Sequence, residues 1–181
     1  MATKRTIILG VTGSIAAYKA ADIASKLKGL GHEVFCVMTK DATQFITPLT
    51  LKTLSHHPVI VDIFAEGEWL PTHIAVADAA DLFVIAPATA NIIAKLAHGI
   101  ADDALTTIAL ALRSETKVLI APAMNARMWL HPATRDNVKI LRKRSVEFIG
   151  PEKGLLACGY EGIGRLWDVN KIMERIQKLL L

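Results

Sequence analysis

Short runs of apolar residues alternate along the chain with longer segments in which apolar residues recur every three to four positions. The short runs are rich in β-branched residues and almost continuously apolar, as strands buried on both faces of a parallel sheet must be. The longer segments have the period of amphipathic helices. The predicted strands are 6–12, 33–38, 82–86, 117–121 and 146–148, with 59–63 as a sixth candidate. The predicted helices are 15–28, 89–97, 102–113, 132–143 and 169–180, with Gly29, Gly31 and Gly99 as stops.

This alternation predicts an α/β protein of three layers, in which a parallel sheet lies between helices on both faces. We interpret residues 1–181 as a single domain, because the sequence shows no repeat, low-complexity segment or linker. In open sheets of this kind, ligands bind outside the carboxyl ends of the strands. Small and amide-bearing residues gather in the turns that follow four predicted strands, namely Gly13-Ser14, Thr39, 87–91 and 122–125.

Composition disfavours a membrane protein and leaves a single globular domain as the expectation. The mean hydropathy is +0.36, but residues such as Asp81 and Lys95 interrupt every apolar stretch before the ~18 residues of a membrane span. Lys4-Arg5 and the apolar run after them imitate a signal peptide, yet an amphipathic helix follows, which favours a buried first strand. We therefore expect no membrane partner.

Charge disfavours nucleic-acid binding, and the cysteine content favours a reducing compartment. The net charge is +4, and the densest basic run, 139–144, falls at a predicted helix C-terminus, where cations suit the helix dipole. We therefore expect no nucleic-acid partner. Cys36 lies in an apolar run and Cys158 in a glycine-rich segment, so they are poor disulfide partners and a cytoplasmic location is expected.

The turn after the first strand, Gly13-Ser14-Ile15, places a glycine and a hydroxyl where a helix begins, an arrangement that can hold an anion. It has neither the Walker sequence nor the full spacing of a dinucleotide site, so a mononucleotide phosphate fits better. The local alternative is that Gly13 makes a tight turn and Ser14 caps the helix. Thr39, Thr89 and Asn91 present polar groups after later strands, with helix capping as the alternative for the last two.

The segment 121–129, which reads Ala-Pro-Ala-Met-Asn-Ala-Arg-Met-Trp, resembles the P-x-M-N-x-x-M-W signature of the homo-oligomeric flavin-containing cysteine decarboxylases. His73-Ile74 and the segment 157–166 resemble two further motifs of that family, the second being its substrate clamp. Together with Gly13-Ser14 and 86–91, the resemblance covers nearly the whole chain. The family includes phosphopantothenoylcysteine decarboxylases and peptidyl-cysteine decarboxylases.

The resemblance implies a flavodoxin-like or Rossmann-like domain that binds FMN, with no metal. It also implies a homotrimer, or a homododecamer of trimers, with the FMN site where subunits meet. A phosphopantothenate-cysteine ligase, fused or separate, is an implied partner. The FMN-binding residues carried over from the family are Gly13, Ser14, Ile15, Thr39, Phe45, Ala88, Thr89, Ala90, Asn91, Ala123 and Met124.

The activity implied is decarboxylation of 4'-phosphopantothenoylcysteine to 4'-phosphopantetheine in coenzyme A biosynthesis. The thiol-bearing carbon is first oxidised with FMN to a thioaldehyde, decarboxylation gives an enethiol, and the enethiol is then reduced. The resemblance makes His73 the catalytic base, Asn125 the holder of the substrate carboxylate and Cys158 the final proton donor. Met128 and Arg165 complete the implied substrate site. Tyr160-Glu161 and Leu166 depart from the family pattern in the clamp.

Each of these residues also has an ordinary structural interpretation. Met124, Met128 and Trp129 suit core packing, His73 alone would be a loop or surface histidine, Cys158 a buried thiol, and Arg165 a solvated surface residue. The alternative functions are a peptidyl-cysteine decarboxylase that stops at the enethiol, a flavin prenyltransferase and a noncatalytic flavoprotein subunit. The presence of Cys158 disfavours the first, and the segment 122–129 the second.

Overall fold

The computed structural model describes residues 4–64 and 73–181 and contains a parallel sheet with the strand order β2-β1-β3-β4-β5. This is the strand order of flavodoxin-like sheets, so the predicted fold class is confirmed. The sequence predicts all five strands to within two residues at either end, and β5 begins one residue later than expected. The strands are β1 (Thr6–Val11), β2 (Glu33–Met38), β3 (Leu82–Ala88), β4 (Lys117–Pro122) and β5 (Glu147–Phe148).

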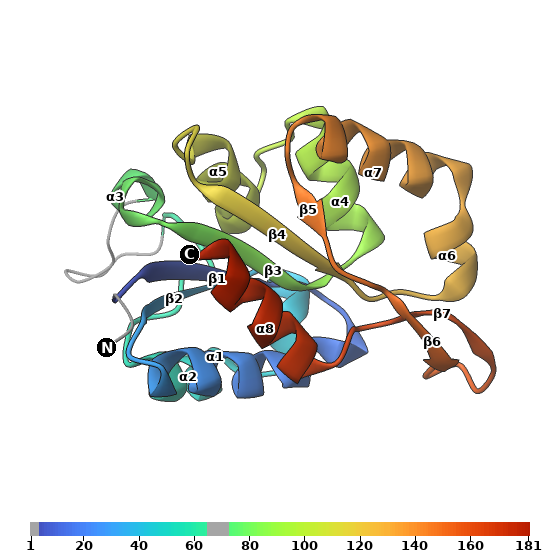
Figure 1. Cartoon of the computed structure of the whole chain (residues 1–181), viewed down its shortest axis with the longest axis horizontal. Coiled ribbons are helices and arrows are strands. Elements are labelled where there is room, and N and C mark those ends of the chain that lie inside the picture. The colour runs from blue at the N-terminus through green and yellow to red at the C-terminus, as the bar shows by residue number, and fades with distance from the viewer. Residues whose placement is uncertain (1–3, 65–72) are drawn as a thin grey trace.

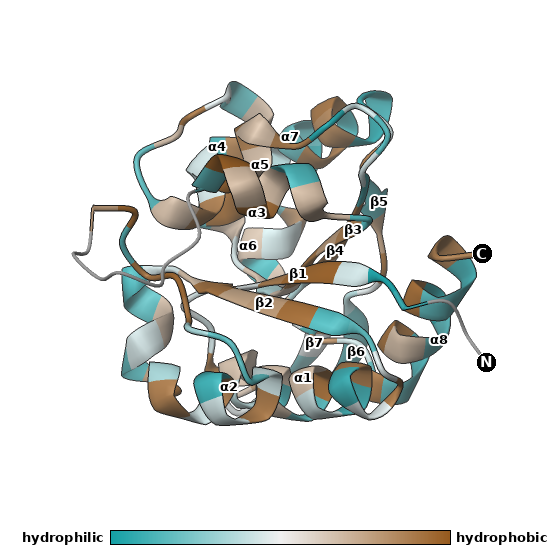
Figure 2. Ribbon diagram, turned by 90° about the vertical axis from the view of Figure 1, so that its left-hand side faces the viewer, coloured by the Kyte–Doolittle hydropathy of each residue, from teal (hydrophilic) through white to brown (hydrophobic). Residues whose placement is uncertain are grey.

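Helices cover both faces of the sheet (Figure 1 and Figure 2). One face carries α1 (Lys19–Gly29), α2 (Pro48–Ser55) and α8 (Val169–Leu179). The other carries α3 (His73–Ala79), α4 (Ala90–His98), α5 (Ala104–Ala111) and α7 (Pro132–Lys143). The short α6 (Ala126–Leu130) follows β4 at its carboxyl end. None of the helices in the described part of the chain has both the length and the apolar character needed to cross a bilayer.

The strands are continuously apolar because their alternate side chains enter two different cores. Ile7 and Leu9 of β1 pack with α1, α2 and α8, whereas Ile8 of the same strand packs with α4, α5 and α7. Side chains of successive strand residues point to opposite faces, so a strand between two helical layers needs apolar residues at every position. Figure 2 shows the brown centre of the sheet between the two layers.

Three predicted elements differ from the structure. Segment 59–63 is not a strand, since only Ile60 forms a bridge, with Val37 of β2. The predicted helix 15–28 is a 3-10 turn, η1 (Ile15–Tyr18), followed by α1. Helix α5 begins later than predicted because Asp103 is its N-cap and forms a reciprocal capping box with Thr106.

The glycine-rich segment near the C-terminus, for which the sequence predicts no strand, is an antiparallel hairpin of β6 (Glu152–Leu155) and β7 (Glu161–Arg165). Its glycines allow close approach to the turn after β4. The Met124 amide donates a 2.9 Å hydrogen bond to the Gly164 carbonyl, and a Cβ on Gly164 would lie 2.0 Å from the Met124 carbonyl oxygen. A Cβ on Gly162 would lie 2.8 Å from Ala126 Cβ. The hairpin therefore rests on the β4–α6 turn through backbone contact.

Gly164→Ala should separate this hairpin from the β4–α6 turn. The added Cβ fits only if one of the two backbones moves, and this movement would break the Met124–Gly164 hydrogen bond. We expect a loss of about 1–3 kcal/mol in the free energy of unfolding, as for other overpacked sites, and faster hydrogen exchange at the Met124 amide. Gly29→Ala is the control, since a Cβ there meets nothing within 4 Å. An unchanged unfolding midpoint with the Met124 amide still protected would contradict this account.

Candidate active site

Two adjoining cavities open at the carboxyl ends of β1, β3 and β4. Their volumes are about 290 Å³ and 390 Å³, and both are lined by Gly13, Thr89 and Met128. Gly13 follows β1 and Thr89 follows β3, so the cavities lie where the strand order of the sheet reverses. Ligands of flavodoxin-like folds bind at this switch point.

Buried Thr12 fixes the two turns that meet there. Its hydroxyl donates to the Pro87 carbonyl at 2.7 Å and accepts from the Thr89 amide at 3.0 Å, which joins the end of β1 to the end of β3. Gly13 is needed for a close approach, since a Cβ there would lie 2.5 Å from Asp41 Cβ in η2 (Lys40–Gln44). Sequence reasoning singled out Gly13 but missed Thr12, although its place at the end of β1 was a usable signal.

Three hydroxyls around the cavities are N-caps. Ser14, Thr39 and Thr89 each accept a backbone N–H at 3.3 Å, at the starts of η1, η2 and α4. The capping interpretation is therefore correct for Ser14 and Thr89, while Asn91 lies inside α4. A capping oxygen only accepts, so each hydroxyl proton remains available to a ligand oxygen. Capping and anion binding are thus compatible at the same residues.

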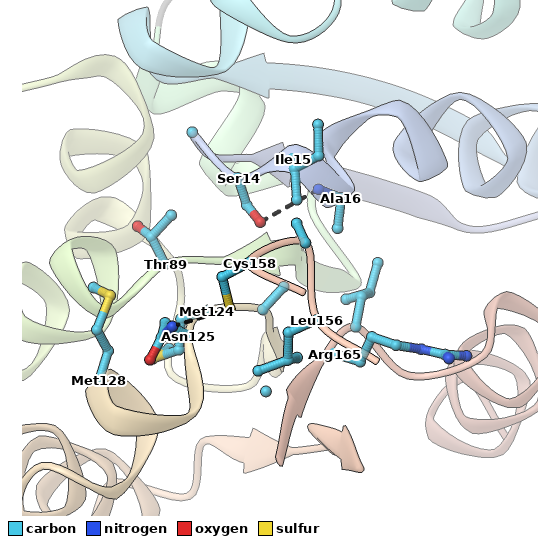
Figure 3. A pocket seen from close by; sticks show the side chains of 15 residues that line it. Ser14, Ile15, Ala16, Thr89, Met124, Asn125, Met128, Leu156, Cys158 and Arg165 are labelled. Atoms are coloured by element: carbon cyan, nitrogen blue, oxygen red, sulfur yellow. Dashed lines mark hydrogen bonds between the residues drawn. The ribbon is translucent and has the colours of Figure 1, made fainter. Parts of the chain in front are cut away.

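Asn125 and Cys158 meet at the edge of the first cavity (Figure 3). Asn125 is the N-cap of α6, and its side-chain oxygen accepts from the Arg127 amide at 2.8 Å. Its Nδ2 lies 3.4 Å from Cys158 Sγ and 2.5 Å from the Tyr160 hydroxyl. The tip of the hairpin thus contacts the turn after β4, which brings two residues 33 positions apart together.

The two cysteines have opposite surroundings. Cys36 is buried in β2, and this burial raises the pKa of its thiol to about 12, against a smaller opposing effect of a hydrogen bond with Ser55. Cys158 is exposed at the tip of the hairpin. The interpretation of Cys158 as a buried thiol is therefore wrong, and it is the cysteine placed to react with a ligand.

Arg165 belongs to the wall of the first cavity, but its guanidinium points away from Asn125 (Figure 3). It lies beside Gly154 and 3.9 Å from the Glu152 carboxylate, both on the neighbouring strand β6. The contact of the Arg165 guanidinium with Glu152 thus joins the two strands of the hairpin. Contact of Arg165 with substrate stays a prediction.

A partly buried cluster of ion pairs forms part of the wall of the second cavity. Lys95 is bonded to Asp102 and Asp103 at 2.7 and 2.9 Å. Burial alone would raise the pKa of Asp103, but its hydrogen bonds with Lys95 and Thr106 outweigh this and hold it below the usual value. Burial would likewise lower the pKa of Lys95, and the two carboxylates raise it instead. Lys95 and Asp103 are therefore both charged at neutral pH.

The lining suits a flat apolar ring with an anionic tail. Ala123, Met124 and Leu156 give the first cavity an apolar wall, while Ser14 and Thr39 supply hydroxyl donors near the first turn. This donor set fits FMN, whose flat ring has apolar faces and whose phosphate needs donors. Within the described ranges, no group of three or more His, Cys, Asp or Glu side chains is arranged to hold a metal ion.

The structure brings most of the predicted site residues to one cleft. Four of them do not line it: Ala88 is buried in β3, Ala90 begins α4, Phe45 is half-exposed after η2, and His73 begins α3. Figure 1 shows α3 far from α6 and the hairpin. Sequence reasoning also missed Leu156 and the contact of Tyr160. The predicted residues that do line the cavities are Gly13, Ser14, Ile15, Thr39, Thr89, Asn91, Ala123, Met124, Asn125, Met128, Cys158 and Arg165.

Similar proteins cover nearly the whole chain. It is 46% identical over 177 residues to a probable phosphopantothenoylcysteine decarboxylase of Streptococcus mutans serotype c. The aligned region covers 97% of this chain and 99% of that protein. It is 47% identical over 179 residues to the coenzyme A biosynthesis bifunctional protein CoaBC of Bacillus subtilis, covering 98% of this chain. The chain spans only 44% of the length of that bifunctional relative.

Solved structures agree with this. A PPC decarboxylase variant complexed with pantothenoylaminoethenethiol matches with a TM-score of 0.85 and 29% identity, over 97% of this chain and 98% of that one. The FMN-dependent cysteine decarboxylase SpaF matches with a TM-score of 0.83 and 34% identity, over 99% and 96%. A family model described as Flavoprotein matches residues 1–181. The chain therefore belongs to the Flavoprotein family.

Proposed function

We propose that this protein is an FMN-dependent decarboxylase that converts 4'-phosphopantothenoylcysteine to 4'-phosphopantetheine in coenzyme A biosynthesis. The observation that carries the proposal is the meeting of Asn125 and Cys158 at the edge of an apolar cleft whose lining also includes hydroxyl donors. The relatives from Streptococcus mutans and Bacillus subtilis bear names from this step or pathway. The cytoplasm, where thiols stay reduced, is the proposed location.

The cofactor supplies the electron chemistry that the side chains lack. FMN, when bound, would supply a two-electron acceptor that is restored in each turnover, so that the thiol-bearing carbon of the substrate could be oxidised before decarboxylation and reduced after it. A thioaldehyde next to the carboxylate-bearing carbon accepts the electron pair released on decarboxylation, which a saturated thiol cannot do. The chain contributes by holding the ring against Ala123 and Met124 and by placing protons and the carboxylate.

Asn125 and Cys158 have complementary tasks in this proposal. Asn125 donates an amide hydrogen to the substrate carboxylate, and a neutral donor orients this group without the strong ground-state stabilisation of an ion pair, which would oppose its loss. Cys158 then gives its proton to the carbon that lost carbon dioxide as the hydride returns to its neighbour. The product is a saturated thiol, and the reaction as a whole is redox-neutral.

His73 takes the thiol proton at the start, and we propose that it comes from a neighbouring subunit. It does not line either cavity of its own chain, and α3 lies far from the hairpin (Figure 1). A site assembled between subunits of a homotrimer, alone or within a larger assembly of trimers, reconciles its role with its position. A ligase, fused or separate, would supply the substrate.

The principal test is incubation of the purified protein with 4'-phosphopantothenoylcysteine and mass analysis of the product. The wild type should release carbon dioxide and form the saturated thiol, whereas Cys158→Ser should accumulate the enethiol or its oxidised form, since serine is a much weaker acid. The bound ethenethiol in the solved PPC decarboxylase variant is in keeping with this. His73→Asn should lose turnover while keeping FMN.

The same assay separates the alternatives. Enethiol as the final product of the wild type would favour a peptidyl-cysteine decarboxylase type of reaction, and absence of carbon dioxide release would refute the decarboxylase. Identical products from wild type and Cys158→Ser would remove Cys158 from its assigned role.

A mixing experiment tests the shared site. His73→Asn and Cys158→Ser chains are co-expressed, and assemblies carrying both are isolated by two different tags. If the two residues act across an interface, each trimer that carries both variants has an intact pair at one of its three sites, so about a third of wild-type thiol formation should return. If both act within one chain, no mixed site is complete and the saturated thiol stays absent. Each variant alone is the control.

A further inference from the structure

The side-chain amide of Asn125 is fixed at both ends. Its Oδ1 accepts from the Arg127 amide at 2.8 Å, as the N-cap of α6. A cap needs an acceptor, so the oxygen must face the helix and the NH2 group must face the hairpin. The orientation of this amide is therefore set by its own backbone before any ligand binds.

The NH2 group has two hydrogens, and the hairpin provides a neighbour for each. Nδ2 donates to the Tyr160 hydroxyl at 2.5 Å and lies 3.4 Å from Cys158 Sγ. The first contact is a short hydrogen bond, and the second is a weak one to sulfur. A ligand oxygen can therefore displace the sulfur contact at much lower cost than the contact with Tyr160.

Tyr160 is 41% exposed and lines neither cavity, whereas Asn125 and Cys158 both line the first. Its hydroxyl thus reaches the cleft only through the Asn125 amide. Tyr160 belongs to the hairpin and Asn125 to the turn after β4, so their hydrogen bond exists only while the hairpin is seated on that turn.

We propose that Tyr160 is a positioning residue, which takes one amide hydrogen of Asn125 so that the other is aimed at the substrate carboxylate beside Cys158. This inference rests on the proposed function. It makes carboxylate recognition depend on contact between the hairpin and the turn after β4, because without the Tyr160 hydroxyl only the cap hydrogen bond of Oδ1 holds the amide. It also predicts that Tyr160 strengthens binding only of ligands that carry the carboxylate.

Tyr160→Phe removes the hydroxyl alone, and Tyr18→Phe is the matched control, since Tyr18 is the other tyrosine of the chain and is also exposed. Both are made in the FMN-loaded His73→Asn protein, so that binding is measured without turnover. Calorimetry then gives the Kd for 4'-phosphopantothenoylcysteine and for 4'-phosphopantetheine, which lacks the carboxylate. Tyr160→Phe should raise the first Kd about three- to tenfold, the range of one hydrogen bond, and leave the second unchanged.

Other outcomes overturn the inference. Equally weaker binding of both ligands would mean that Tyr160 only holds the hairpin in place. An unchanged Kd for both ligands would mean that its hydrogen bond with Asn125 contributes nothing to binding. Tighter binding of the carboxylate ligand would make Tyr160 a competitor for Asn125. Failure of the wild type to decarboxylate the substrate would refute the proposed function itself, which is a separate result from these three.

Discussion

The candidate site depends on one backbone contact, that between Gly164 of the hairpin and Met124 in the turn after β4. The parallel sheet supplies only half of the cleft, with its hydroxyls and small residues, and the hairpin supplies the thiol. A hydrogen bond of 2.9 Å joins the two halves, and only glycine fits at position 164, because a Cβ would lie 2.0 Å from a carbonyl oxygen. This backbone contact brings Cys158 and Tyr160 of the hairpin within hydrogen-bonding distance of Asn125.

The polar groups of the cleft are mostly neutral and are fixed by local structure. Ser14, Thr39, Thr89 and Asn125 all accept a backbone N–H as N-caps, which orients them and leaves one hydrogen of each for a ligand. Lys95 and Asp103 lie at the wall of the second cavity, where their opposite charges compensate each other. Such an arrangement is preorganised, and its donors need little rearrangement when a ligand enters.

Much of this fold could be predicted from the sequence, because strands such as β1 and β3 are buried on both faces and so are apolar throughout. The site turns followed from the rule for the carboxyl ends of parallel strands, which placed Gly13, Thr89 and Asn125 together. The hairpin could not be predicted in this way. Its residues read as a loop because Gly162 and Gly164 have a low preference for strands, and only the three-dimensional contact with Met124 and Ala126 shows why they are glycines.

The position of His73 was also beyond the reach of pattern rules. A resemblance assigned the role of base to this residue, but the spacing of one sequence cannot reveal that the residue lies away from the cleft in its own chain. Tyr160 was noticed only as a departure from a motif, and its significance appeared once its hydroxyl was found on the amide of Asn125. Long-range contacts of single side chains are set by packing, and no local periodicity encodes them.

The central claim is that the cleft between the first turn and the hairpin holds FMN. The most direct measurement is titration of the flavin-stripped protein with FMN, followed by visible absorption and flavin fluorescence. The account predicts tight, stoichiometric uptake and a yellow protein with altered flavin fluorescence. A protein that stays colourless and leaves the fluorescence of added FMN unchanged would contradict it.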